Sequence, residues 1–350
     1  MRAWDRGDEL IAQRREAADA ENLEALEAEG IELDPSSPGS HRHGDVEHPS
    51  DHEHPHAHSG PGERPVVGIV GAGSVGTALG VALDRAGWPV GAVASRDPAR
   101  RERFRSLVTG VRAFAEPEAL IDDVELVMLA VPDDVVAPLA GSLRLYAGQA
   151  IVHTSGLLGA EVLAPALGAG SQAGAFHPLV AFADLDRALA ALPGATIAIE
   201  GDEDLAGHLA DMAEAIGAVP VRIAPGSKAA YHAAAVLAAG GVVALLDVIR
   251  EVAAATGMDE AGALRIYLPL LRQTVANAEA MGVARALTGP APRGDAGTVT
   301  AHLATLRADA PDAIAVYRAL LDRSITIAVG RGTLAPEPTE RLRTALAADG

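Results

Sequence analysis

The pattern of apolar and polar positions changes abruptly near residue 64. Before that point apolar residues are sparse, and the segment from Asp34 to Gly62 consists mainly of Pro, Ser, Gly, His and acidic residues. Such a segment cannot bury enough apolar surface to offset the entropy cost of ordering it. The pattern therefore predicts a disordered tail over residues 1–64, in which only the stretch from Glu9 to Glu29 has the composition of a helix.

Beyond the tail, short apolar runs alternate with stretches of helical periodicity. Alternation of this kind is typical of parallel βαβ units. It predicts a doubly wound α/β domain of the Rossmann type, with a parallel sheet, over residues 65–224. The expected strands cover residues 66–70, 90–94, 111–114, 126–131, 150–153, 173–176 and 196–199.

After Pro225 the pattern is helical to the end of the chain, which predicts an all-α domain over residues 225–350. The segment His232–Ile249 comes closest to a membrane span, but glycines and an aspartate interrupt it. We interpret it as a buried helix and expect no membrane-spanning segment. The expected helices cover residues 228–256, 260–281 (with a break at Pro269), 298–307 and 312–329.

Composition narrows the classes of function. The 350 residues suit two folded domains. A net charge of −19, of which −10 lies in the tail, and an aromatic content of 3% argue against nucleic-acid binding, which needs basic side chains and stacking rings. The chain has no cysteine, which excludes disulfides, thiolate nucleophiles and thiolate metal sites. With an N-terminus too acidic for a signal peptide, these features predict a cytoplasmic protein.

Seven of the twelve histidines lie in the tail. Alternating imidazoles and carboxylates bind Zn²⁺, Ni²⁺ or Cu²⁺ loosely. The alternative, which we prefer, is a solvated polar linker without a physiological metal, so no metal site is assigned. The histidines concerned are His41, His43, His48, His52, His54, His56 and His58.

A glycine motif follows the first expected strand. Gly71, Gly73 and Gly76 fit the spacing G-x-G-x-x-G, with an apolar strand before the motif and a helical pattern after it. The first glycine permits a tight turn, the second lets a pyrophosphate approach the backbone, and the third lets helix and strand pack closely. The phosphates would then face the helix N-terminus at Ser74 and Val75. The motif predicts a dinucleotide site.

The end of the second strand indicates which dinucleotide binds. An NAD enzyme usually has an Asp or Glu about 20 residues beyond the motif, where it binds the ribose 2′-hydroxyl. Ser95 and Arg96 stand there instead, and a hydroxyl with a guanidinium suits a 2′-phosphate. Arg100 and Arg101 follow, and Asp97 fits the N-cap of the next helix. We therefore predict NADP(H) rather than NAD(H).

Polar clusters follow three later strands, and a fourth opens the helical region. In doubly wound sheets the ligand lies beyond the carboxyl ends of the strands, so these clusters are candidates for the active site. Positions i, i+3 and i+4 of a helix share a face, so the residues of the fourth cluster are expected to converge. The clusters are Val131-Pro132-Asp133, His153-Thr154-Ser155-Gly156, Phe176-His177-Pro178-Leu179, and Lys228 with Tyr231 and His232. We assign Val131 and Pro132 to the cofactor, and Lys228, His232, His177, His153 and Ser155 to catalysis.

Each assignment has a structural alternative. His153 suits a hydrogen bond within the sheet as well as catalysis. Lys228 suits a surface position at a helix start, although a cation there opposes the helix dipole. Arg293 and Asp295, between two expected helices, suit a turn or a loop of the substrate domain, and a role in the cleft stays open.

Residues 65–330 resemble the 6-phosphogluconate-dehydrogenase-like superfamily, which includes ketopantoate reductase, pyrroline-5-carboxylate reductase and prephenate dehydrogenase. Within it the chain is most similar to a bacterial family of Rossmann-like oxidoreductases whose C-terminal helical domain has no assigned function. The resemblance implies NAD(P) binding, a helical domain that closes over the nicotinamide, and a dimer built through the helices. The segments that carry it are residues 153–156, 177–179, 228–233 and 288–295.

One position departs from the family pattern, because Gly240 stands where these relatives usually have an Asn. In ketopantoate reductase and hydroxyacid dehydrogenases a Lys and an Asn flank the substrate. The resemblance therefore carries over only Lys228, which leaves the substrate open.

Three functions stay open. In the first, NADPH delivers hydride to a carbonyl of a small 2-oxo acid such as ketopantoate, and Lys228 or His232 donates the proton. In the second, the reaction is the reverse dehydrogenation, or imine reduction, with His177 or His153 as the acid–base group. In the third, the chain is a non-catalytic NADP(H) sensor whose acidic tail binds a partner. In each case the apolar helices over residues 228–281 predict a homodimer.

Overall fold

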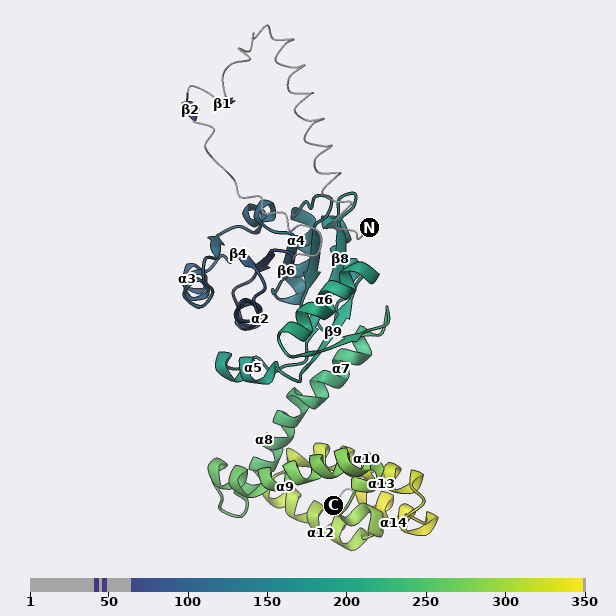
Figure 1. Cartoon of the computed structure of the whole chain (residues 1–350). Helices are drawn as coiled ribbons and strands as arrows, with labels where there is room; N and C mark the ends of the chain where they lie inside the picture. Colours follow the sequence, from purple (N-terminus) through teal and green to yellow (C-terminus); the bar gives the residue numbers. More distant parts are fainter. Residues whose placement is uncertain (1–40, 44–45, 49–63, 349–350) are drawn as a thin grey trace. The chain divides into compact units, whose positions relative to one another are not determined.

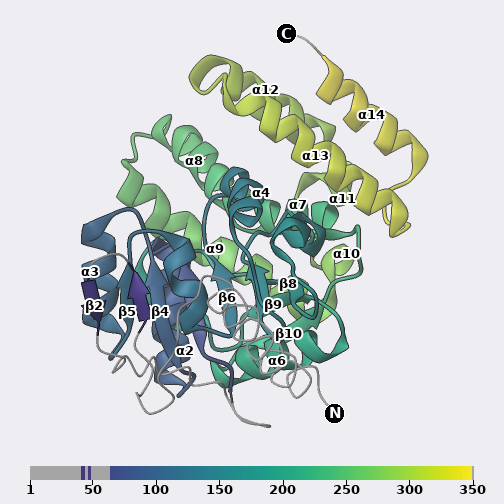
Figure 2. The same ribbon diagram turned by 90° about the horizontal axis from the view of Figure 1, so that it is seen from above.

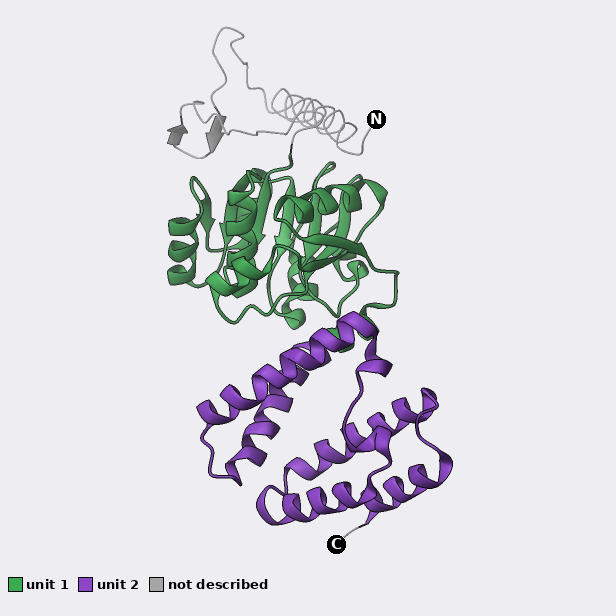
Figure 3. Cartoon of the chain, turned by 60° about the horizontal axis from the view of Figure 1, so that its bottom comes forward, with its two compact units in different colours: residues 1–235 green, residues 236–350 purple. Residues whose placement is uncertain are grey.

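The computed structural model describes residues 41–43, 46–48 and 64–348. Two short strands, β1 (His41–His43) and β2 (Val46–His48), pair in an antiparallel hairpin that the sequence did not predict. The rest of the predicted tail, with its expected helix and four of its histidines, lies outside the described residues. The chain divides into two compact units, residues 1–235 and 236–350 (Figure 3).

An eight-stranded sheet forms the centre of the first unit (Figures 1 and 2). Its strand order is β10-β9-β8-β7-β6-β3-β4-β5. Six neighbouring strands of this sheet have the order β5-β4-β3-β6-β7-β8. When they are renumbered along the chain with β3 as strand 1, this order is 3-2-1-4-5-6, which is that of the Rossmann fold. The predicted fold class is therefore confirmed. The strands are β3 (Val67–Val70), β4 (Val90–Ala94), β5 (Arg112–Phe114), β6 (Leu126–Leu129), β7 (Ala150–His153), β8 (Gln172–Pro178), β9 (Thr196–Glu200) and β10 (Val219–Arg222).

The last two strands run against the others. β9 pairs antiparallel with β8, so that Pro178 lies opposite Ile197, and β10 then runs parallel to β9. The wholly parallel sheet expected from the sequence is therefore wrong at this edge, since alternating strands and helices do not encode strand direction. β10 was not predicted, because its residues are mostly exposed and include Pro220, a residue tolerated in edge strands.

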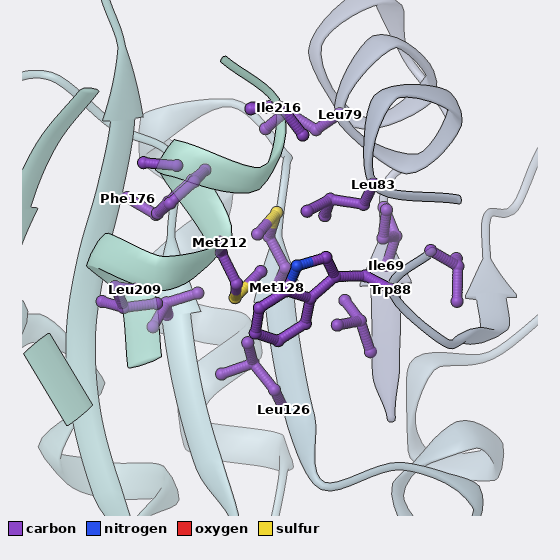
Figure 4. Packing of buried hydrophobic residues seen from close by; sticks show 14 of the residues in the cluster. Ile69, Leu79, Leu83, Trp88, Leu126, Met128, Phe176, Leu209, Met212 and Ile216 are labelled. Atoms are coloured by element: carbon purple, nitrogen blue, oxygen red, sulfur yellow. The ribbon is translucent and has the colours of Figure 1, made fainter. Parts of the chain in front are cut away.

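Apolar cores lie on both faces of the sheet. Consecutive residues of a strand point to opposite faces, and Ile69 and Val70 of β3 accordingly belong to different clusters. In the larger cluster, Trp88 and Met128 pack beside Met212 (Figure 4). The surrounding helices are α2 (Ser74–Arg85), α3 (Pro98–Leu107), η1 (Pro117–Asp123), α4 (Asp133–Ser142), η2 (Ala160–Ala166), α5 (Leu185–Ala191) and α6 (Glu203–Ala215).

The helical part begins with α7 (Lys228–Ala238), and the second unit consists of helices joined by turns. The break expected at Pro269 is wrong: α9 continues through it, because this proline is exposed and water can reach the carbonyl that it leaves unpaired. The break lies instead at Ala239, between α7 and α8. The last helix was not predicted. The helices are α8 (Gly240–Ala254), α9 (Glu260–Met281), α10 (Val283–Ala286), α11 (Pro290–Arg293), α12 (Ala296–Asp309), α13 (Ala313–Gly330) and α14 (Pro336–Ala347).

The stretch Lys228–Ala254 exposes its apolar side chains. By length and composition it is a candidate membrane span, with a mean hydropathy of 2.0 over its most apolar window, and none of that window is buried. The interpretation of residues 232–249 as a buried helix is therefore wrong for the single chain. Leu237 is 72% exposed and Val243 67% exposed, and Leu270 and Val275 of α9 are similarly open.

Candidate functional site

The three motif glycines occupy three different environments. Gly71 has a φ of 106°, and a Cβ there would lie 2.2 Å from the carbonyl oxygen of Ala130. At Gly76 a Cβ would lie 2.0 Å from the carbonyl oxygen of Gly71. At Gly73, by contrast, a Cβ would meet no described atom within 4 Å. Two glycines are thus required by packing, whereas the third leaves open space where a ligand can approach the backbone.

The N-terminus of α2 opens onto this space. Gly73 is its N-cap and offers no side-chain acceptor to the first N–H groups, while Ser74 is exposed and Val75 half-buried. A helix start without a side-chain cap leaves N–H donors and the positive end of the dipole available to an anion. Beside the motif lies a pocket of about 340 Å³, lined by Ala72, Gly73, Ser74, Thr77, Arg100, Arg103 and residues 182–185 and 188.

The end of β4 is held by its own polar side chains. Asp97 caps α3 by accepting from the backbone N–H groups of Ala99 at 2.9 Å and Arg100 at 3.2 Å, so the capping role expected for it is confirmed. Arg101 donates to the carbonyl oxygen of Ser95. Arg96 is exposed. At the end of β6, Val131 is half-buried, and Pro132 is exposed as the N-cap of α4.

Lys228 is joined to the turn that follows β7. Its side chain is only 3% exposed, and Nζ donates to the carbonyl oxygen of Ser155 at 2.8 Å. The Ser155 hydroxyl accepts from the backbone N–H groups of Leu157 at 3.1 Å and Leu158 at 3.0 Å. The turn is therefore fixed from two sides, and the Ser155 hydroxyl acts within it as an acceptor.

Two imidazoles meet over Gly156, the next residue of this turn. A Cβ at Gly156 would lie 2.3 Å from Nδ1 of His232 and 2.7 Å from Nε2 of His177. The two rings stand edge to face, with centroids 5.8 Å apart. Tyr231 completes the group, because its hydroxyl lies 3.4 Å from Nδ1 of His177. Nδ1 of His232 is buried and has no hydrogen-bond partner among the described residues.

His153 lies deeper than this group. It is fully buried at the end of β7, and its Nε2 lies 3.0 Å from the carbonyl oxygen of Gly159. Its Nδ1 has no partner within the described part of the chain. Burial lowers the pKa of His153 to about 4, against the opposing effect of the Gly159 hydrogen bond. The imidazole of His153 is therefore neutral near pH 7. Its contact with Gly159 is consistent with the structural alternative, a hydrogen bond within the fold.

Burial and mutual repulsion also set the charges of the other groups. Burial, and next the nearby Lys228 and His232, together lower the pKa of His177 to about 4. Burial likewise lowers the pKa of the Lys228 ammonium, which Glu200 and Asp133 partly oppose. Burial raises the pKa of the Tyr231 hydroxyl. The site thus combines the neutral imidazoles of His153 and His177 and the protonated Tyr231 hydroxyl with one amine of weakened basicity.

Sequence reasoning missed two signals. Lys228 is the only lysine in the chain, against 27 arginines, and its isolation by itself marks an amine that a guanidinium does not replace. Glu200, at the end of β9, also escaped notice, although it accepts from the N–H of Ala160 at 3.1 Å and opposes the lowered pKa of Lys228. Its place next to β8 depends on a reversed strand that the sequence pattern does not reveal.

The remaining candidates from the sequence lie in the second unit. Asp295 is the N-cap of α12 and accepts from the N–H of Thr298 at 3.0 Å and from its hydroxyl at 2.7 Å. Its side chain thus has a structural role, and Arg293 ends the short helix before it. At Gly240 a Cβ would meet no described atom within 4 Å, so packing does not explain the glycine.

Two family profiles match successive parts of the chain. A Rossmann-like domain matches residues 53–178, and a domain of unknown function, DUF2520, matches residues 195–324. The chain is a Rossmann-like protein with a DUF2520 domain. In this Rossmann–DUF2520 protein the first profile contributes the glycine motif, Ser155 and His177, and the second contributes Lys228 and His232. The candidate site therefore draws on both families.

Solved structures resemble the Rossmann–DUF2520 chain over most of its length. Protein TM1727 from Thermotoga maritima is 27% identical, with a TM-score of 0.60 over 76% of this chain and 99% of its own. BF3122 from Bacteroides fragilis, assigned as an NADP oxidoreductase, is 24% identical, with a TM-score of 0.61 over 75% and 98%. The reductive aminase of Aspergillus terreus in complex with NADPH and ethyl-5-oxohexanoate is 18% identical, with a TM-score of 0.57 over 81% and 99%. No curated protein matches the sequence.

Proposed function

We propose that the chain is an NADP(H)-dependent oxidoreductase that acts on a C=O or C=N group of a small molecule. The observation that carries the proposal is the position of two features in one unit. An open glycine turn follows β3, and a buried amine–imidazole cluster gathers at the ends of β7 and β8. In a doubly wound sheet both belong to the edge where ligands bind.

The glycine turn fits a dinucleotide. The free space at Gly73 and the uncapped start of α2 suit a pyrophosphate, and the arginines after β4 suit a further phosphate. When bound, NADPH supplies the hydride. Among the similar structures, BF3122 is assigned as an NADP oxidoreductase and the reductive aminase contains NADPH, which supports this choice of cofactor.

The cluster is suited to move a proton. When hydride reaches the carbon of a C=O or C=N group, the oxygen or nitrogen gains an electron pair and needs a proton. The Lys228 ammonium carries three N–H groups, of which one is used on Ser155, and its lowered pKa favours release of a proton. The Tyr231 hydroxyl lies 3.4 Å from Nδ1 of His177; in the tautomer in which this hydroxyl donates, Nε2 carries the ring hydrogen and can hold the substrate oxygen or nitrogen.

The substrate class has two candidates. A small 2-oxo acid, as in ketopantoate reductase, is the first, because a cationic amine and the neutral imidazole of His177 suit a carboxylate beside a carbonyl. An imine is the second, favoured by the similarity to a reductive aminase that binds NADPH and a keto ester. Reduction of either consumes one hydride and one proton and leaves an alcohol or an amine.

We further propose that the protein works as a cytoplasmic homodimer. Leu237, Val243, Leu270 and Val275 expose apolar surface on three helices. Exposed apolar surface on long helices is typical of a partner site or a membrane site. The break at Ala239 and the charged residues Asp247, Arg250 and Glu251 of α8 disfavour a membrane span, so a second copy is the better occupant.

The test is NADPH oxidation by the purified full-length chain, with a panel of 2-oxo acids and a panel of ketones mixed with amines. Turnover on either panel supports an oxidoreductase and identifies the class. NADPH binding without turnover on any carbonyl, imine or hydroxy acid would contradict it and support a non-catalytic NADP(H) sensor.

A further inference from the structure

The buried amine of Lys228 has no direct anionic partner. Its side chain is 3% exposed, and Nζ donates to the neutral carbonyl oxygen of Ser155 at 2.8 Å. No carboxylate of the described residues forms an ion pair with this amine. A buried charge that lacks an opposite charge is strongly destabilising, so we expect a carboxylate that acts through the intervening structure.

Strand register brings a glutamate to the right face of the sheet. His153, the last residue of β7, lies opposite Ala175 of β8, and Ala175 lies opposite Glu200, the last residue of β9. Residues directly opposite one another on neighbouring strands point to the same face. Ala175 is fully buried, and its small side chain leaves room for the larger neighbours on both sides. The carboxylate and the imidazole therefore stand on one face of the sheet.

The turn after β7 connects this carboxylate with the amine. At the start of the turn, Lys228 Nζ donates to the carbonyl oxygen of Ser155. At its end, Oε2 of Glu200 accepts from the N–H of Ala160 at 3.1 Å. Between them, Nε2 of His153 lies 3.0 Å from the carbonyl oxygen of Gly159. A cation and an anion thus hold the two ends of one short backbone segment.

Glu200 is the best shielded of the acidic groups near the amine. Burial lowers the pKa of Lys228, and three carboxylates oppose this effect, Glu200 most and then Asp133 and Glu161. Asp133 and Glu161 are exposed, so water screens them, whereas Glu200 is half-buried. The other titratable groups of the cluster lie on β7, β8 and α7, and they are His153, His177, Tyr231 and His232.

We propose that Glu200 is a positioning residue, which acts across the turn after β7 to keep the Lys228 amine protonated and ready to protonate the substrate. This inference rests on the proposed function, in which NADPH supplies the hydride. The proton then leaves Nζ and bonds to the substrate oxygen or nitrogen that has gained the electron pair. Lys228 is left neutral and takes a new proton from water.

The experiment follows the amine itself by NMR. Lys228 is the only lysine in the chain, so full-length protein grown with isotope-labelled lysine gives a single lysine signal that reports protonation of Nζ. In Glu200→Gln the amide oxygen still accepts from the N–H of Ala160 but carries no charge. The midpoint of the lysine titration should therefore move to lower pH by about one unit, the lower end of the effect of a nearby opposite charge.

Turnover should follow the same titration. Because reduction needs the protonated amine, the rate with NADPH in Glu200→Gln should fall off at correspondingly lower pH, while NADPH affinity stays nearly unchanged. Glu200→Asp, which keeps the charge, should bring the midpoint back toward that of the unaltered protein. Glu203→Gln is the matched control, because it removes the same charge from an exposed side chain that pairs with Arg222 at 2.8 Å. Melting temperatures confirm that each variant folds.

Three outcomes overturn the inference. Equal lysine titrations in Glu200→Gln and Glu203→Gln would show that the carboxylate does not act on the amine. A Glu200→Asp variant that titrates like Glu200→Gln would show that the charge has no role. A lysine midpoint that moves while the turnover profile does not would exclude Lys228 as the proton donor. Since the lysine signal needs no turnover, an unaltered protein without turnover would refute the proposed function separately.

Discussion

Lys228 Nζ and the Ser155 carbonyl oxygen lie 2.8 Å apart, although the two residues are 73 positions apart in the sequence. This hydrogen bond ties the first turn of α7 to the turn after β7. An ammonium group has three N–H donors, and Ser155 uses one of them. The same side chain can therefore fix the turn and still present positive charge to a ligand.

The first prediction concerns this amine. Lys228→Met should lower turnover by about 10²–10⁴-fold, as loss of a positioned general acid does, and leave NADPH affinity nearly unchanged. Lys228→Arg should not restore turnover, because a planar guanidinium neither fits the ammonium site nor releases a proton. Steady-state kinetics and NADPH titration measure both effects. An arginine variant with more than half of the original turnover would show that charge alone suffices.

The second prediction concerns pH. Burial lowers the pKa of folded His177 to about 4, whereas an unfolded histidine has a pKa of about 6.5. Between these values the unfolded chain binds more protons, so the free energy of unfolding should rise from pH 4 to 6.5 and fall on acidification. His153 acts in the same direction. His177→Gln should remove about half of this slope in urea unfolding, while Tyr231→Phe, which keeps the imidazole, should preserve it.

The third prediction concerns the contact between the two imidazoles and Gly156. Gly156→Ala should cost about 1–3 kcal/mol, because the added Cβ overlaps both rings. Gly141→Ala is the control, since it lies in α4 with no described atom within 4 Å of the new Cβ. Adding His232→Ala should recover part of the loss. Strict additivity of the Gly156→Ala and His232→Ala costs in urea unfolding would show that the rings do not cause the strain.

The fourth prediction separates two glycines of one motif. Gly76→Ala should destabilise the fold, since its Cβ would lie 2.0 Å from a backbone oxygen. Gly73→Ala should leave the melting temperature nearly unchanged and weaken NADPH binding, because its Cβ enters open space that a pyrophosphate needs. Thermal unfolding with NADPH titration tests both. Unchanged NADPH affinity in Gly73→Ala would place the pyrophosphate elsewhere.

The fifth prediction concerns assembly. If a second copy covers the exposed apolar helices, light scattering should give a dimer mass at micromolar concentration. Val243→Glu and Leu270→Glu, which put charge on that surface, should shift the mass toward the monomer. Val219→Glu is the control, since Val219 is 52% exposed on β10 of the first unit. A monomer mass for the unaltered protein would contradict the dimer.

The sequence predicted the Rossmann sheet because its strands are buried on both faces and read as short apolar runs between helical stretches. It did not predict β10, whose exposed residues form no such run, or the reversal at β9, because strand direction depends on long-range pairing. It also predicted a helix break at Pro269, but α9 continues through this residue, since an exposed helical position tolerates the lost hydrogen bond.

The candidate site was predicted in part. Strand ends pointed to His153, Ser155 and His177, and helical spacing brought Tyr231 and His232 to one face, which the structure places beside His177. The spacing could not reveal that Ser155 uses its hydroxyl within the turn, or that Gly156 is a glycine because of two rings from distant segments. Such facts depend on packing between segments far apart in sequence.

The reversal of β9 has a consequence for how this protein family can diversify. Because β8 and β9 are antiparallel neighbours, the last residues of β8 lie opposite the first residues of β9. The connection through α5 therefore does not have to cross over the sheet. It therefore remains beside the glycine motif, where Ala188 and Leu192 are buried and Leu189 packs against the larger apolar core. Its exposed positions, residues 183, 184, 186 and 187, can change their side chains without altering strand register. The surface beside the glycine motif can thus change while the order of the strands stays the same.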